Sequence, residues 1–155
     1  MDDDERARLR TIADYQFGAG AGAALFPDGE ALAVWRSSTG RPQQVQTADE
    51  TRLVSYGTDG RFTLAYAGGA RLHDALGRPR VEVGEESVPF VRDGKNAFAK
   101  FVRHADADVR PGDEVLVTHA GALLAVGRAE LPAAGMADFE TGMAVKVRDG
   151  AGTGE

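Results

Sequence analysis

Short runs of aliphatic, β-branched and aromatic residues, separated by glycine, proline and aspartate, follow one another along most of this chain. Such runs are typical of half-buried strands joined by tight turns. In the N-terminal half they predict strands at 31–35, 43–48, 51–56 and 62–66. In the C-terminal half they predict strands at 98–102, 114–117 and 123–126, with turns at 111–113 and at Gly121.

The sequence predicts helices at two places. Leu9, Ile12 and Ala13 predict an amphipathic helix from Asp4 to about Asp14, whose acidic first turn suits the helix dipole. A second, short helix is expected at 69–76, ended by Gly77. Pro79 then marks a domain boundary, so we expect an α+β module at 1–78, a second domain at 79–150 and a frayed tail at 151–155.

The end of the first helix carries the segment Ala13-Asp-Tyr-Gln-Phe-Gly18, followed by more glycines up to Gly22. We expect Asp14 and Tyr15 to anchor the helix to the first sheet, with Tyr15 or Phe17 buried. The glycine run lacks the GK[ST] of a phosphate loop, and no strand clearly precedes it. It therefore indicates a flexible turn or a close approach of two backbones.

One strand stands out because it combines aromatic residues with a cation. In the run from Phe98 to Val102, Phe98, Lys100 and Val102 would share one face, with Ala99 and Phe101 on the other. A lysine projecting beside an aromatic ring could meet a nucleic-acid phosphate. The alternative is an ordinary solvated lysine.

Composition excludes several classes of site. The chain has no cysteine, so disulfides, cysteine-based zinc sites and thiolate nucleophiles are ruled out. His73, His104 and His119 lack the spacing of metal ligands, and no catalytic constellation is visible, so we expect no metal, no cofactor and no catalytic residues. No long apolar run occurs and the N-terminus is acidic, so we expect a cytoplasmic protein without a membrane contact.

The net charge of −6 is unusual for a nucleic-acid binder. Either the protein does not bind nucleic acid, or an acidic surface surrounds a local basic patch. Only three basic residues are lysine and fifteen are arginine, a composition that suggests a halophilic source and favours the second interpretation. At high salt, counterion release contributes little, so binding would depend on shape, stacking and directed hydrogen bonds.

The order of several short motifs resembles the PUA family. Arg80–Val83, the segment 88–94, Gly112–Val117 with the pattern "GD.V.V", Ala125–Ala129 with "avG.a" and Gly142–Val147 with "G.aV.v" occupy the places of the family's elements. The sequence GKNAFAKFV at 94–102 and the segment 11–18 are similar to the C-terminal region of archaeosine tRNA-guanine transglycosylases. The resemblance covers about 10–150 and implies a small α+β module followed by a PUA-like mixed β-barrel.

The resemblance also implies an RNA groove lined by Gly94, Lys95, Lys100 and Arg128. Further candidates for this RNA-binding surface are Asn96, Arg92, Arg103 and Lys146. Each has an alternative role that the residues leave open: a helix C-cap for Gly94, surface ion pairs for the arginines, and a solvated edge for Lys146. Phe90 and Phe98 could stack on bases, although core positions are expected for most phenylalanines in so small a barrel.

These observations predict a non-catalytic protein that binds tRNA or another structured RNA, as an archaeal-type accessory part of a tRNA-modifying enzyme. A (β/α)8 catalytic domain needs roughly 250 residues, so the 155 residues of this sequence correspond only to the accessory part, and a catalytic partner protein is expected. The alternative is a protein-interaction module of the translation or RNA-modification machinery without RNA affinity.

Overall fold

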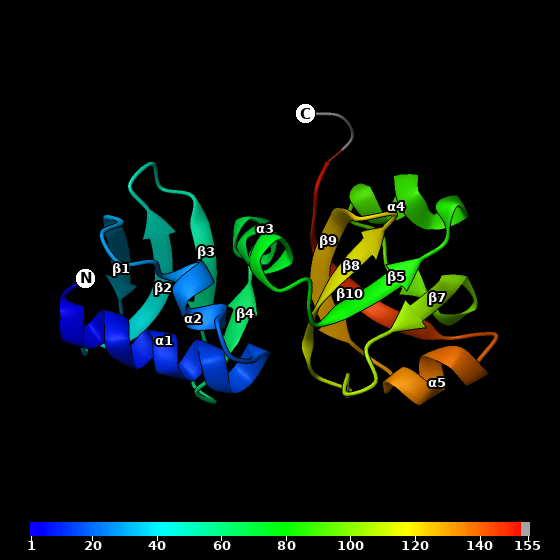
Figure 1. Ribbon diagram of the computed structural model, residues 1–155, viewed down its shortest axis with the longest axis horizontal. Helices are drawn as coiled ribbons and strands as arrows, with labels where there is room; N and C mark the ends of the chain where they lie inside the picture. Colours follow the sequence, from blue (N-terminus) through cyan, green and yellow to red (C-terminus); the bar gives the residue numbers. More distant parts are fainter. Residues whose placement is uncertain (153–155) are drawn as a thin grey trace. The chain divides into compact units, whose positions relative to one another are not determined.

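The computed structural model describes residues 1–152, which fold as two compact units (Figure 1). Unit 1 comprises Met1–Leu76 and unit 2 begins at Gly77. This division lies two residues before the predicted boundary, and the predicted tail falls partly outside the described residues. No helix within residues 1–152 has both the length and the apolar character needed to cross a membrane.

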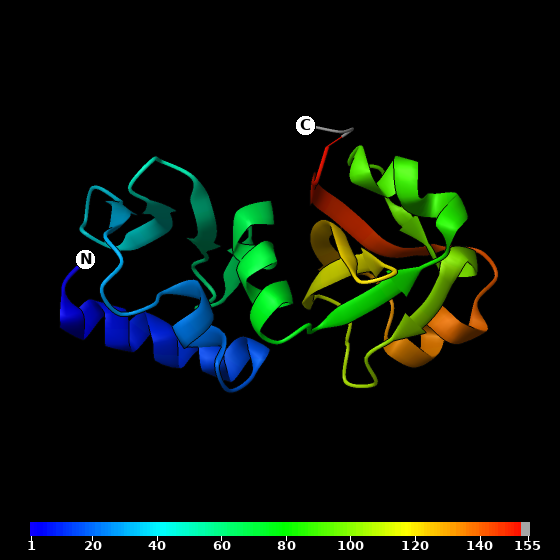
Figure 2. The ribbon, with the colours of Figure 1, turned by 45° about the horizontal axis from the view of Figure 1, so that its top comes forward.

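Unit 1 is an antiparallel four-stranded sheet with helices on one side. The strand order is β1-β2-β3-β4. In Figures 1 and 2, α1 and α2 lie on the same side of this sheet, and α3 packs against α2. The elements are α1 (Asp3–Phe17), α2 (Ala21–Leu25), β1 (Leu32–Arg36), β2 (Pro42–Thr47), β3 (Arg52–Tyr56), β4 (Phe62–Leu64) and α3 (Tyr66–Ala75).

The first helix runs three residues past its predicted end because its last turn is held by packing and hydrogen bonds. Phe17 is 2% exposed in the core. Gln16 anchors the helix to the sheet: its amide donates to the carbonyl of Phe62 at 2.9 Å and accepts from the Phe62 N–H at 2.7 Å. Tertiary contacts thus extend a helix whose local periodicity ends earlier.

The predicted anchor at Asp14 and Tyr15 is wrong. Asp14 accepts a hydrogen bond from the Gly22 N–H at 2.7 Å, so it holds α2 rather than the sheet. Tyr15 is 95% exposed, because the next helical positions rather than this one face the core. The glycine run makes the close backbone approach that was one of its two predicted roles: a Cβ on Gly22 would lie 2.4 Å from the carbonyl oxygen of Arg10.

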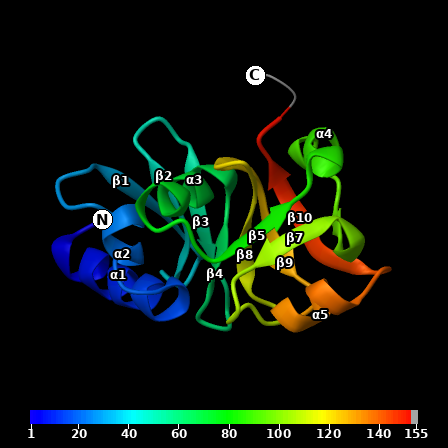
Figure 3. The same ribbon diagram turned by 45° about the vertical axis from the view of Figure 1, so that its right-hand side comes forward.

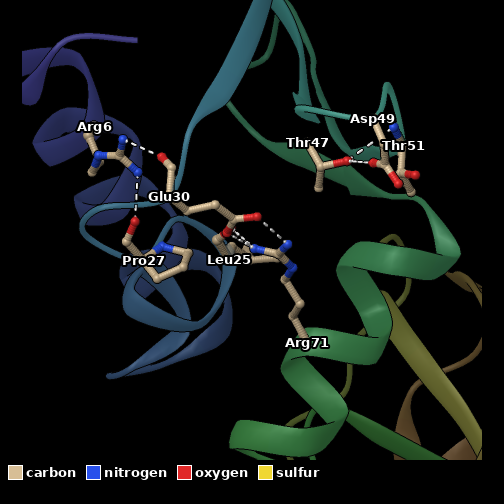
Figure 4. Close-up of polar contacts among 8 residues, drawn as sticks. All are labelled: Arg6, Leu25, Pro27, Glu30, Thr47, Asp49, Thr51 and Arg71. Carbon is tan, nitrogen blue, oxygen red and sulfur yellow. Dashed lines mark hydrogen bonds and ion pairs between the residues drawn. The ribbon is translucent and has the colours of Figure 1, made fainter.

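An arginine–carboxylate pair ties α3 to the connection between α2 and β1 (Figure 4). Arg71 donates to both carboxylate oxygens of Glu30, at 2.6 and 2.8 Å, and to the carbonyl of Leu25 at 3.2 Å. Arg6 donates to the carbonyls of Pro27 and Glu30 at 2.7 and 2.8 Å. The hydrogen bond from Arg71, followed by the charges of Arg71 and Arg6, lowers the pKa of Glu30 against the opposing effect of burial.

Unit 2 is a nearly closed barrel of six strands in the order β6-β10-β9-β8-β5-β7. β5 and β8 pair in parallel and the other neighbours are antiparallel, so the predicted mixed barrel after an α+β module is confirmed. Figures 1 and 3 show α4 and α5 at opposite ends of this barrel. Its elements are β5 (Arg80–Val83), η1 (Glu85–Ser87), α4 (Val88–Arg92), β6 (Ala97–Phe98), η2 (Ala99–Phe101), β7 (Val102–Ala105), β8 (Glu114–His119), β9 (Ala122–Ala129), α5 (Ala133–Asp138) and β10 (Met143–Gly150).

The predicted continuous strand at 98–102 is wrong. β6 pairs with β10 and β7 pairs with β5, so the two strands lie at opposite ends of the sheet order. The 3-10 turn η2 connects them and closes the barrel. Ala97 and Ala99 are 1% and 2% exposed in the core, whereas Phe98 and Lys100 are exposed. The alternation of buried and exposed residues therefore holds, although the strand does not.

Helix α5 was not predicted, because it is only six residues long and has no cap or apolar period of its own. Tertiary contacts hold it: the Ala133 N–H donates to the carbonyl of Val109 at 3.1 Å, and Met136 is 1% exposed in the core.

We expect Glu30→Gln to lower the free energy of unfolding of unit 1 at pH 7 by about 1–2 kcal/mol, because Arg71 loses a bidentate charged acceptor. The pKa of Glu30 is lowered in the folded chain from its ordinary value of 4.5. Its contribution is therefore present above about pH 4.5 and is lost as the pH falls through the lower, folded pKa. Urea unfolding followed by fluorescence of Trp35, the one tryptophan, measures the difference.

Asp28→Asn is the matched control, because Asp28 pairs with Arg10 at 2.7 Å but its side chain is 83% exposed. This change should cost less than about 0.5 kcal/mol. Equal losses in the two variants, or a Glu30→Gln deficit that persists unchanged into acid, would contradict the prediction.

Candidate nucleic-acid interface

All three lysines of the chain lie at one edge of unit 2. Lys95 precedes β6, Lys100 lies in η2, and Lys146 lies on β10, the strand that pairs with β6. All three are exposed, and within residues 1–152 none forms an ion pair. Exposed cations without carboxylate partners are available to bind an anionic ligand such as an RNA phosphate.

Lys95 is positioned by the C-terminus of α4. The Gly94 N–H donates to the carbonyl of Val91 at 3.0 Å and the Lys95 N–H donates to that of Phe90 at 2.9 Å, a Schellman motif that requires the φ of +92° found at Gly94. Gly94 therefore has the helix C-cap role that was one of its two predicted alternatives. No atom lies within 4 Å of where its Cβ would be, so the turn is also open to a ligand.

The neighbouring candidates Asn96 and Arg92 contribute to the fold. The side-chain carbonyl of Asn96 accepts from the Val147 N–H at 2.9 Å, where β10 changes register. The backbone carbonyl of Arg92 accepts from the Gly152 N–H at 2.8 Å, and its side chain is half-buried. Both residues thus fix the end of β10 against the turn that carries Lys95.

Lys100 and the aromatic residues beside it line a groove of about 410 Å³. The Lys100 ammonium lies 4.9 Å from the centre of the Phe101 ring. Phe98 is 46% exposed and Phe90 on α4 is 60% exposed, so the expectation that these two phenylalanines belong to the core is wrong. The residues lining the groove are Phe98, Lys100, Phe101, Glu140, Thr141 and Gly142.

The far wall of this groove, residues 140–142, was not identified from the sequence. It is joined to η2 by a hydrogen bond from the Ala99 N–H to the carbonyl of Gly142 at 2.9 Å. The exposed Phe139, which precedes it, was a possible signal. The groove has aromatic walls, the ammonium group of Lys100 and the carboxylate of Glu140. Its rings can stack on an unpaired base, and Lys100 is the group that can meet the attached phosphate.

A second cationic cluster lies on β9 and β10. Lys146 is the cross-strand partner of Arg128, and together with Val147 and Arg148 they line a depression of about 230 Å³. Arg128 forms the ion pair that was its predicted alternative, with Glu130 at 2.9 Å, yet its side chain is 49% exposed. Lys146 is thus the cation of this cluster that forms no ion pair in the described chain.

Arg148 forms an ion pair with a buried carboxylate. Lys146 and Arg148 alternate with Val145 and Val147, a pattern that by itself predicts a shared exposed face, and both residues are exposed. β10 changes register between Val147 and Asp149. The Arg148 guanidinium donates to both carboxylate oxygens of Glu114, at 2.5 and 2.7 Å, and Glu114 is 4% exposed. Gly127 is required beside this irregularity, because a Cβ there would lie 2.4 Å from the carbonyl oxygen of Lys146.

Arg103 lies on β7, at the opposite end of the sheet order from β6. It forms an ion pair with Glu86 at 2.8 Å and reaches the carbonyl of Lys100 at 3.4 Å. The ion pair was its predicted alternative role. The structure therefore places Lys95, Lys100, Arg128 and Lys146 on or beside the neighbouring strands β6, β10 and β9, with Lys100 in one hollow and Arg128 and Lys146 in another. Arg103 is paired on β7.

Comparisons with known proteins agree with this architecture. Residues 7–79 match the patch-forming domain C2 of tRNA-guanine transglycosylase, and residues 79–151 match the PUA domain. The chain is 43% identical over 150 residues to the tRNA-guanine(15) transglycosylase of Methanothermobacter thermautotrophicus, covering 95% of this chain and 23% of that protein. It is 45% identical over 145 residues to the enzyme of Pyrococcus furiosus, covering 92% of this chain and 24% of that protein. The chain thus spans about a quarter of the length of these relatives and matches a C-terminal region.

Solved structures with this fold include a hypothetical protein from Pyrococcus horikoshii OT3, with a TM-score of 0.74, 20% identity and coverage of 99% of this chain and 94% of that one. A conserved PUA domain protein from Thermoplasma acidophilum has a TM-score of 0.66 and 21% identity, and the match covers 99% of this chain and 93% of that one. At these identities the likeness establishes the two-unit fold.

We expect Arg148→Met to lower the free energy of unfolding of unit 2 by about 3 kcal/mol, because the buried Glu114 carboxylate loses its guanidinium partner. The double variant Glu114→Gln/Arg148→Met should recover part of this loss, since no buried charge is then left without its partner. Urea unfolding followed by circular dichroism measures both. Arg128→Met is the control: its ion pair with Glu130 is exposed, so it should cost less than about 1 kcal/mol. A double variant as unstable as the sum of its single variants would argue against the pair.

Proposed function

Because this chain is a PUA-domain protein that resembles the C-terminal region of archaeal tRNA-guanine transglycosylases, we propose that it binds structured RNA, with tRNA as the ligand, through the β6–β10 edge of unit 2. The observation that carries this proposal is the position of the lysines. Every lysine of a chain with net charge −6 lies at that edge, exposed and outside any ion pair of the described residues.

The chemistry of the edge suits RNA backbone recognition. Lys100, Lys146 and Lys95 supply point charges for phosphates, which set position but do not read sequence. The aromatic groove beside Lys100 accepts a base that has left its stack, as at a single-stranded end of an RNA stem. The open turn at Gly94 allows a sugar–phosphate backbone to approach closely, because no side chain occupies that space.

We propose that this region binds and positions the RNA, and that the chemical reaction is carried out by another domain or chain. Its relatives are tRNA-modifying enzymes of which it matches about a quarter. Among residues 1–152, no group of three or more His, Asp or Glu side chains is arranged to hold a metal ion. Such a division of labour places substrate positioning on this region, which contributes to the rate by holding the RNA in a reactive orientation.

Titration of the purified protein with total tRNA over a salt series tests the proposal. We expect saturable binding, with log Kd changing linearly with the logarithm of the salt concentration. The slope of that line should be smaller by about 1 in Lys100→Ala, and likewise by about 1 in Lys146→Ala, because each variant loses one phosphate contact. The loss of affinity should be similar for different tRNA sequences. Fluorescence anisotropy of labelled tRNA measures both quantities.

Arg8→Ala is the matched control, because it removes one exposed positive charge from α1 in unit 1 and changes the net charge by the same amount. Its binding should equal that of the unmodified protein. Equal weakening in all three variants would mean that net charge alone drives binding. No tRNA binding at any salt concentration would favour the alternative, a protein-interaction module.

A further inference from the structure

The sheet of unit 1 has a face that is turned away from α1 and α2. Leu32, Val45, Val54 and Leu64 are buried on the helix side. On the other side the strand register aligns Trp35 with Gln44, Gln44 with Ser55, and Ser55 with Thr63. These four side chains form a row across all four strands, and we call the face that they occupy the outer face. Trp35 is 57% exposed on it.

A second row lies beside the first. Ala33 is aligned with Gln46, and Gln46 with Arg52. The two rows are connected by side-chain hydrogen bonds: Arg52 donates to the Ser55 hydroxyl at 3.1 Å, and the Gln46 amide donates to that of Gln44 at 3.4 Å. The amides and the guanidinium are therefore held in place on the sheet, which lowers the entropy lost when a ligand is bound.

The outer face differs in charge from the rest of the chain. Asp and Glu are absent from both rows, although 24 of the 155 residues are acidic, and Arg52 is the one ionised side chain in them. Arg52 forms no ion pair in the described chain. The turn that joins β2 to β3 contains two carboxylates, Asp49 and the exposed Glu50, and that of Asp49 accepts a hydrogen bond from the Thr47 hydroxyl within the turn (Figure 4).

We propose that the outer face binds unpaired nucleotides of RNA, with one base stacked on Trp35. The indole supplies a flat ring for stacking, Gln44 supplies donors and acceptors for base edges, and Arg52 supplies a cation for the adjacent phosphate. Gln46 is only 7% exposed, so its amide serves to position Gln44. A protein ligand would call for an apolar patch around the tryptophan. Its neighbours here are instead amide and hydroxyl groups. The ligand class rests on the proposed RNA-binding function, but the site lies in the other unit.

Trp35 makes this proposal directly measurable, because it is the one tryptophan of the chain. Its fluorescence should be quenched saturably when the full chain is titrated with single-stranded oligoadenylate or oligouridylate hexamers. An RNA duplex of the same length with blunt ends should cause little quenching, because its bases are already stacked and paired. Arg52→Gln and Gln44→Ala should each weaken the quenching titration at least about fivefold.

Lys100→Ala is the control that separates this site from the edge of unit 2: it should weaken tRNA binding and leave the Trp35 titration unchanged. Circular dichroism of each variant establishes that it is folded. An unquenched Trp35 at saturating oligonucleotide overturns the proposal and leaves the outer face for a protein partner. The proposal is also overturned if Arg52→Gln and Gln44→Ala leave the quenching titration unchanged, or if the quenching disappears in Lys100→Ala. Lysine variants that do not affect tRNA binding would instead refute the proposed function while leaving the Trp35 result to stand.

Discussion

Closure of the six-stranded barrel through residues 99–101 is the constraint on which the second unit depends. The strands on either side of this 3-10 turn are neighbours in sequence but lie at the two ends of the sheet order. The turn must therefore cross the open seam of the barrel, and the small side chains of Ala97 and Ala99 allow it to pack on the core. The same geometry turns Phe98 and Lys100 outwards, next to β10. The sheet is nearly closed, with β6 and β7 as its two end strands, and the residues of η2 connect them across the seam.

Ion pairing divides the basic residues into two groups. Several arginines are held by carboxylates in bidentate pairs, a geometry that the planar guanidinium favours. Glu5 with Arg36, Glu30 with Arg71 and Glu114 with Arg148 are of this kind. These pairs connect elements that are distant in sequence and form part of the fold. The lysines are excluded from this network, so a protein of net negative charge keeps a local cationic edge.

The two units differ in the chemistry of the surfaces that we propose bind RNA. The edge of unit 2 offers exposed ammonium groups and an aromatic groove, which suit phosphates and a displaced base. The outer face of unit 1 offers a tryptophan with amides and one guanidinium fixed on a sheet. Cations acting alone lose their effect as salt rises, whereas stacking on an aromatic ring does not depend on counterion release. A protein that uses both kinds of contact would keep part of its RNA affinity at high ionic strength.

By itself the sequence determined where most strands lie, which residues turn the chain, and the order of motifs that identifies the PUA domain. Such features are local: glycine, proline and the alternation of apolar residues act on a few neighbouring positions. Only the tertiary structure decided that 98–102 bends across the barrel seam, that Gln16 rather than Asp14 holds the first sheet, and that Arg148 pairs with Glu114. It also decided that Phe90 and Phe98 are exposed. Each of these outcomes depends on a partner far away in sequence, and local periodicity carries no information about which distant residue will supply it.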